Sequence, residues 1–131
     1  MPPGGHASIL GLAYKPGTSV ADASTGIGLA AELRSRGVAT SVYDPAAAVS
    51  ARRMLGEGIV YAESIRDCLH GADVAIVATA WDAFRELDPA DVAQDGRRPM
   101  VIDCWRILDR ERFRAVADVV YLGRSDSEDE N

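Results

Sequence analysis

The chain has 131 residues, of which 47% are hydrophobic and 26% are charged, and its formal net charge is −6 at pH 7. This length fits one domain and excludes a two-domain enzyme with a cleft between lobes. The acidic balance argues against a nucleic-acid partner, and no apolar run approaches the roughly 20 residues that a membrane helix needs, so we expect no membrane partner either.

The N-terminal part of the chain alternates between strand and helix patterns. Residues 1–6 (MPPGGH) are expected to be a flexible N-terminus, and their lack of a secretory signal pattern favours a cytoplasmic protein. The continuous apolar run from Ala7 to Leu12 predicts a strand buried on both faces. Ser24 suits the N-cap of a helix that runs to Arg36, and Gly37 suits its C-terminal stop.

The rest of the chain continues this alternation. Residues 73–78 (DVAIVA) form the clearest strand pattern, because they are continuous, apolar and rich in β-branched side chains. The other predicted strands cover residues 40–43, 59–61, 100–103 and 119–122, and the predicted helices or helical turns cover residues 46–55, 65–69, 82–87, 89–93 and 109–115. The sequence therefore predicts an α/β, three-layer Rossmann-like domain with a mostly parallel sheet over residues 7–124.

The last seven residues, 125–131 (SDSEDEN), contain four acidic side chains and no basic one. This composition predicts an acidic, disordered tail, with an interaction tail as the alternative.

Several residue types that often carry chemistry are predicted to be structural here. Cys68 and Cys104 are interpreted as reduced, partly buried thiols, and no histidine lies at a spacing that would complete a metal site with them. Trp81 and Phe84 are expected to anchor a short helix on the sheet. Asp103 is expected to end a strand and to orient the following loop.

Residues 26–31 (GIGLAA) match the pattern G-x-G-x-x-A of dinucleotide-binding turns. In those turns the first glycine directly follows the first strand, whereas more than ten residues separate Gly26 from Leu12. Asp44, 18 residues after Gly26, resembles the acid that binds the ribose. We favour close helix–sheet packing by Gly26 and Gly28, and NAD binding by an independent dinucleotide-binding domain remains the alternative.

The loop from Ala13 to Ala23 is the stronger candidate for a ligand site. A loop at the carboxyl end of a parallel strand lies where open α/β sheets bind ligands. Lys15 stands in this loop between Tyr14 and the turn residues Pro16-Gly17. An ammonium group suits a phosphate or diphosphate, and the neighbouring ring can stack on a base. A surface lysine in a turn is the alternative.

Five segments occur in the order and at the spacing of the motifs of one enzyme family. They are GLAYKPGT (11–18), VYDP (42–45), ADVAIVATAWDAFRELD (72–88), VIDCWRILD (101–109) and YLGR (121–124). Together they resemble the C-terminal, UDP-binding domain of the UDP-glucose/GDP-mannose dehydrogenases, and the likeness spans nearly the whole chain.

This resemblance implies a part in the oxidation of a nucleotide sugar. Family enzymes convert the C6 hydroxyl to a carboxylate with two NAD equivalents. In them an N-terminal Rossmann domain holds NAD, and a central helical segment bears the catalytic cysteine and lysine. The resemblance implies that this chain binds a nucleotide-sugar ligand, holds no cofactor and is inactive by itself. Its partners would be those N-terminal and central domains if it is part of a longer enzyme, and a homo-oligomer stays open.

The resemblance also implies which residues bind the substrate. Tyr14 and Lys15 match the aromatic–lysine pair that contacts the nucleotide diphosphate in the family. Thr18 matches the threonine of the K-P-x-T motif, and Arg106 lies in the segment that matches D-G-R-[NR]. The predicted substrate-binding residues are therefore Tyr14, Lys15, Thr18 and Arg106.

Three residues depart from the family pattern. Val20 and Asp22 replace the aspartate and arginine of K-P-x-T-x-D-x-R-x-S, and the family arginine reaches toward the NAD pyrophosphate. Trp105 replaces the anion-binding arginine of D-G-R-[NR], although the adjacent Arg106 offers a substitute. These departures leave open which nucleotide sugar is bound. They also leave a second hypothesis, a non-catalytic Rossmann-like interaction module that has lost the diphosphate site.

Overall fold

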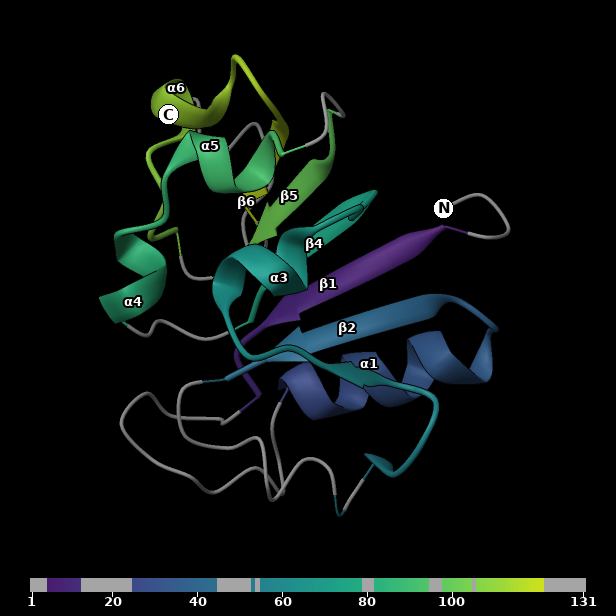
Figure 1. Ribbon diagram of the computed structural model, residues 1–131. Coiled ribbons are helices and arrows are strands. Elements are labelled where there is room, and N and C mark those ends of the chain that lie inside the picture. The colour runs from purple at the N-terminus through teal and green to yellow at the C-terminus, as the bar shows by residue number, and fades with distance from the viewer. Residues whose placement is uncertain are drawn as a thin grey trace.

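A computed structural model describes residues 5–12, 25–44, 53, 55–78, 82–94, 98–104 and 106–121. Its strands are β1 (His6–Leu10), β2 (Ala39–Tyr43), β3 (Val60–Tyr61), β4 (Val74–Val77), β5 (Met100–Asp103) and β6 (Asp118–Tyr121). They form one sheet in the order β3-β2-β1-β4-β5-β6, and every neighbouring pair is parallel (Figure 1). The predicted Rossmann-like α/β class is confirmed.

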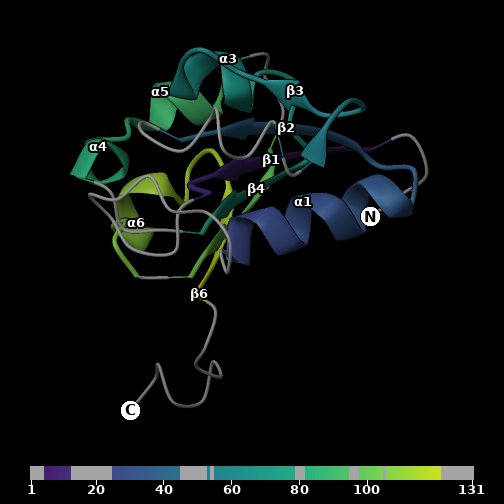
Figure 2. The ribbon, with the colours of Figure 1, turned by 90° about the horizontal axis from the view of Figure 1, so that it is seen from below.

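The helices cover the two faces of this sheet. They are α1 (Thr25–Ser35), α3 (Ile65–Leu69), α4 (Asp82–Arg85), α5 (Pro89–Val92) and α6 (Arg110–Phe113). Because successive strand residues point to opposite faces, Ile9 joins Ala30 of α1 in one core, whereas Leu10 joins Phe84 and Phe113 in the other. Figure 2 shows α1 on one side of the sheet, and α3 and α5 on the other.

The face that α1 covers is partly open at one end. Met100 of β5 and Val120 of β6 share a face with Ile102, which packs against the core of α1, and they are 43% and 36% exposed. The buried side chains of α3, α4, α5 and α6 all belong to the opposite core. Among the described elements, β5 and β6 are therefore covered mainly on one face, although parallel sheets are usually covered on both.

Local sequence sets the ends of the helices. Gly37, at φ 76°, ends α1 and donates its N–H to the carbonyl of Arg34 at 3.0 Å, as predicted for a helix stop. Ser64 caps α3, Asp88 forms a capping box on α5, and Asp109 caps α6. The predicted N-cap residue of α1, Ser24, lies outside the described residues.

The strands and helices agree with the sequence-based expectations to within a few residues. The helix predicted at residues 46–55 can be compared only at Arg53 and Leu55, because the other residues of this segment lie outside the described part of the chain. Both residues are helical. Phe84 is fully buried, as expected of an anchor, and Trp81 lies outside the described residues. No described helix is long and apolar enough to span a bilayer.

Candidate functional site

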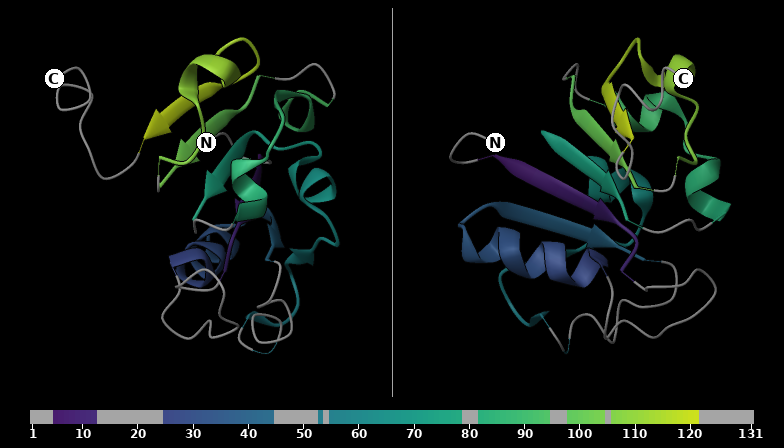
Figure 3. Two further views of the ribbon diagram at one scale, coloured as in Figure 1. Left: turned by 90° about the vertical axis from the view of Figure 1, so that its left-hand side faces the viewer. Right: turned by 180° about the vertical axis from the view of Figure 1, so that it is seen from behind.

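The carboxyl ends of the parallel strands meet at one edge of the sheet, and this edge contains a topological switch point. From β1 the chain winds outward through β2 to β3, and it then crosses back to β4 on the other side of β1 (Figures 1 and 3). Open α/β sheets bind ligands in the crevice beside such a switch point. The loops that leave β1, β4 and β5 at this edge therefore form the candidate site.

The loop after β1 carries three predicted site residues, Tyr14, Lys15 and Thr18, which lie outside the described residues. The start of this loop is held firmly at the edge. Gly11 donates its N–H to the carbonyl of Tyr43 at 2.7 Å, and Leu12 donates its N–H to Oδ2 of Asp44 at 2.7 Å.

Asp44 is the residue that the glycine-string hypothesis would use to bind a ribose. Its side chain is only 5% exposed, and its carboxylate accepts the hydrogen bond from the Leu12 amide. A buried carboxylate that holds a backbone amide is serving the fold. This observation favours a structural role for Asp44 over ribose binding.

The glycines of the string have different surroundings. A Cβ atom added to Gly26 would overlap the carbonyl oxygen of Gly11 and lie 3.1 Å from Cα of Leu12, so the predicted close packing of helix on sheet is confirmed at this position. Among the described residues, nothing outside its own helix lies within 4 Å of the corresponding point on Gly28, and the packing prediction is wrong there. Gly26 lies within α1 and against the backbone of Gly11 and Leu12, not in the turn directly after β1, so the string does not fit a pyrophosphate-binding turn.

The loop between β5 and α6 is fixed by a second buried carboxylate. Asp103, with no exposed surface, accepts a hydrogen bond from the N–H of Leu108 at 2.8 Å. Cys104 donates its N–H to the carbonyl of Val77 at 3.1 Å, which ties the loop to the end of β4. The prediction that Asp103 ends its strand and orients the following loop is confirmed.

Arg106, the predicted site residue within the described part of the chain, lies in this loop at the carboxyl edge. Its backbone has a φ of 54°, and its side chain is exposed. The guanidinium carbon lies 4.5 Å from the ring centroid of Tyr121, at the carboxyl end of β6. Sequence reasoning gave Tyr121 no role, although an aromatic residue at the end of the last strand is a usable signal.

Neither cysteine is placed to act as a nucleophile. Burial raises the pKa of the Cys68 thiol to about 12. Partial burial and, to a smaller extent, the charge of Asp103 raise the pKa of Cys104. Both thiols are free, and the reactive thiolate form is disfavoured in each.

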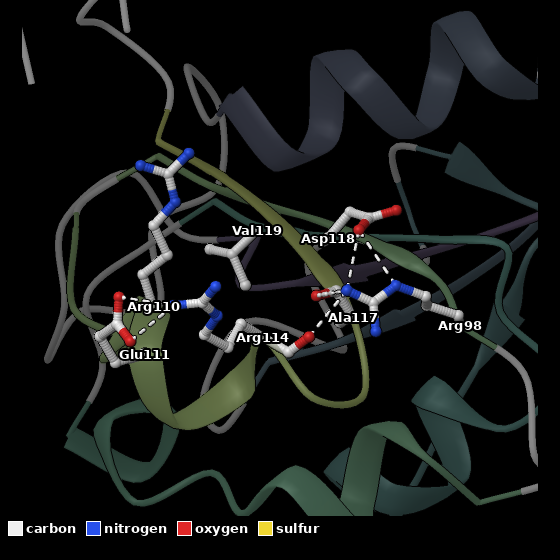
Figure 4. Close-up of a pocket in the computed structure, with 7 residues that line it drawn as sticks. All are labelled: Arg98, Arg110, Glu111, Arg114, Ala117, Asp118 and Val119. Carbon is white, nitrogen blue, oxygen red and sulfur yellow. Dashed lines mark hydrogen bonds and ion pairs between the residues drawn. The ribbon is translucent and has the colours of Figure 1, made fainter.

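A separate cavity of about 440 Å³ lies between α6 and β6 (Figure 4). Arg98 pairs with Asp118 at 3.0 Å, and Arg114 pairs with Glu111 at 2.9 Å. Arg110 also lines the cavity, but its guanidinium lies 5.4 Å from the centroid of the Tyr121 ring. The topological switch point lies at the carboxyl edge, and the carboxyl edge therefore remains the better candidate for a ligand site.

The chain is similar in sequence to known proteins. The model of the UDP-glucose/GDP-mannose dehydrogenase family, UDP binding domain, matches residues 8–110. The UDP-glucose 6-dehydrogenase of Haloferax volcanii is 41% identical over 107 residues, which are 82% of this chain and 24% of that protein. The UDP-glucose 6-dehydrogenase of Rickettsia conorii is 31% identical over 114 residues, which are 86% of this chain and 26% of that protein.

Solved structures show the same relationship. A UDP-glucose dehydrogenase from Pyrobaculum islandicum superimposes with a TM-score of 0.75 at 31% identity, covering 93% of this chain and 26% of that one. The chain therefore spans about a quarter of the length of the relatives that it matches.

Proposed function

The chain belongs to the UDP-glucose/GDP-mannose dehydrogenase family, as its UDP binding domain, and from this premise we propose that it binds the nucleotide end of a UDP-sugar substrate. The observation that carries the proposal is the family match over residues 8–110, which includes the two loops, after β1 and after β5, that contain the predicted site residues. The diphosphate of the ligand is the group that these loops are best suited to bind.

The sheet order supports a diphosphate between the two loops. The strands that precede them, β1 and β5, are separated only by β4, so the strand ends lie about 10 Å apart. In this proposal Lys15 approaches the diphosphate from the first loop, with Tyr14 and Thr18 beside it, and Arg106 approaches from the second. An ammonium and a guanidinium both form charge-assisted hydrogen bonds with phosphate oxygens.

The rest of the reaction is assigned to other domains. The relatives are about four times as long as the matched region, and we propose that this chain works together with N-terminal NAD-binding and central catalytic domains of an NAD-dependent nucleotide-sugar 6-dehydrogenase in the cytoplasm. NAD would supply hydride acceptance in the domain that binds it. This chain contributes binding and orientation of the nucleotide.

Calorimetric titration of the chain with UDP tests the proposal. We expect weak binding in the wild type and a loss of about tenfold or more in affinity in Lys15→Ala and in Arg106→Ala, because each change removes a charge-assisted contact worth about 1.5–3 kcal/mol. Arg36→Ala is the matched control. Arg36 follows the last turn of α1, far from the carboxyl edge, and pairs with Glu32 on the same helix at 2.9 Å.

A folded wild-type chain that binds no UDP at millimolar concentration would contradict the proposal. That outcome would favour the second hypothesis, a non-catalytic interaction module. Two replacements support this hypothesis: Asp22 and Trp105 each stand where the family pattern has an arginine. Equal losses of affinity in Arg36→Ala and Arg106→Ala would show that only net charge matters.

A further inference from the structure

Tyr121 makes two contacts with the loop between β5 and α6 and a third with the first residue of α6. Its hydroxyl donates a hydrogen bond to the carbonyl of Leu108 at 2.9 Å and accepts one from the N–H of Arg110 at 3.2 Å. Its ring lies 4.5 Å from the guanidinium carbon of Arg106. One side chain at the end of β6 therefore holds both the backbone of the loop and the cation that the loop presents.

The backbone of Arg106 shows that this loop is tightly constrained. Arg106 is the one non-glycine residue with a positive φ among the described residues. A branched or long side chain in this conformation is unfavourable, so the conformation persists only where the surroundings enforce it. The bond from Asp103 to the Leu108 amide spans Arg106, and the Tyr121 hydroxyl holds Leu108 from the other side.

The ring of Tyr121 also gathers positive charge at this edge. The guanidinium of Arg110 lies 5.4 Å from the same ring centroid, so two arginines lie within cation–π distance of one aromatic face or edge. An arginine that is already seated on a ring loses less conformational freedom when an anion binds, and this preorganisation improves affinity. A phosphate-bearing ligand benefits from both effects.

We propose that Tyr121 is a positioning residue for substrate binding: its ring seats the guanidinium of Arg106, and its hydroxyl holds the surrounding loop. Arg106 is thereby presented at the carboxyl edge to the diphosphate of the nucleotide. The ligand in this inference rests on the proposed function. The contact between the Tyr121 ring and the Arg106 guanidinium exists in the free protein and can be measured without ligand.

Nuclear magnetic resonance of the free chain detects the contact between the Tyr121 ring and the Arg106 side chain directly. A ring at this distance shifts the side-chain protons of Arg106, and comparison with Arg106→Lys assigns them. We expect the ring-current shift in the wild type and in Tyr121→Phe, which keeps the ring, and its loss in Tyr121→Leu. Absence of the shift in the wild type would overturn the proposal, even if Tyr121→Leu failed to fold.

Titration with UDP and with uridine then measures the effect on binding. We expect Tyr121→Leu to weaken UDP binding about three- to tenfold, to leave any uridine binding unchanged, and to add nothing in the double variant with Arg106→Ala. Tyr121→Phe should retain most of the affinity. A merely structural role would instead weaken uridine and UDP equally and add to the loss in Arg106→Ala. Thermal unfolding establishes that each variant is folded.

The outcomes separate this inference from the function on which it rests. If the folded wild type binds no UDP, the proposed function is overturned and the inference with it. If UDP binds and Arg106→Ala weakens it while Tyr121→Leu does not, the function stands and the positioning role of Tyr121 is overturned.

Discussion

Two buried carboxylates do similar work at the carboxyl edge of the sheet. Asp44, after β2, holds the amide of Leu12 in the first loop, and Asp103, at the end of β5, holds the amide of Leu108 in the second. A carboxylate is an acceptor-only group and satisfies backbone N–H groups that no strand pairs. At the scale of single residues, the candidate site is therefore shaped by acids that do not need to touch a ligand.

A buried thiol gives a residue-scale prediction about pH. Burial raises the pKa of Cys68 from 9.0, the ordinary value of a thiol, to about 12 in the folded chain, so between these values the folded state holds a proton that the unfolded state has lost. Stability from this group is full below about pH 9 and is lost as the pH rises toward 12, with a slope of up to about 1.4 kcal/mol per pH unit.

Urea unfolding at pH 7, 9 and 10 checks this expectation in the wild type and in Cys68→Ala. Because the other titrating groups are common to both proteins, the difference between them isolates the thiol. We expect the stability of the wild type to fall more steeply above pH 9 than that of Cys68→Ala. Parallel curves would show that the thiol ionises equally easily in both states.

At the scale of elements, the strands were largely predictable because an apolar, β-branched run such as residues 73–78 fits little else than a buried strand. The end of α1 was predictable because glycine readily adopts the positive φ that ends a helix, as Gly37 does. The surroundings of Gly28 were not, since helical periodicity does not reveal which turn touches the sheet. The partnership of Tyr121 with Arg106 joins strand and loop through space and leaves no local pattern.

The two glycines at the start of α1 give an element-scale prediction with opposite signs. Gly26→Ala should destabilise the chain by about 1–3 kcal/mol. The added Cβ would overlap the backbone of Gly11, and backbone atoms cannot move aside as a flexible side chain can. Gly28→Ala should stabilise it by about 0.5–1 kcal/mol, because alanine is the better helix former and its Cβ meets open space.

Thermal and urea unfolding of these two variants provide the measurement, and each serves as the control for the other. Equal effects of the two substitutions would contradict the close approach of α1 to β1.

At the scale of the whole molecule, the described helices cover the sheet unevenly. Strands of a parallel sheet are usually buried on both faces, and the largely apolar residues of β5 and β6 fit that expectation. Hydrophobicity alone does not show which helices lie over a strand, and Met100 and Val120 are half-exposed in the structure. The order of the strands likewise depends on how the crossovers wind, which a single sequence does not encode locally.

The open end of this face gives a prediction about the isolated chain. Exposed apolar side chains on one face of neighbouring strands bind hydrophobic dyes, so the double variant Met100→Gln/Val120→Thr should lower anilinonaphthalene sulfonate fluorescence, while stability changes by only about 0.5 kcal/mol. Val60→Thr is the matched control, since Val60 is 62% exposed but lies at the opposite edge of the sheet. A similar decrease in both proteins would contradict this expectation.

The contact between Gly26 and the carbonyl of Gly11 has a further consequence for the loop that joins β1 to α1. The two ends of this connection, residues 12 and 25, are brought together by the fold itself. The entropy of closing a loop of about a dozen residues is thus lost during folding and not during recognition. A ligand that binds Lys15 therefore does not have to offset the entropy of chain closure, because that entropy is lost once, when the domain folds.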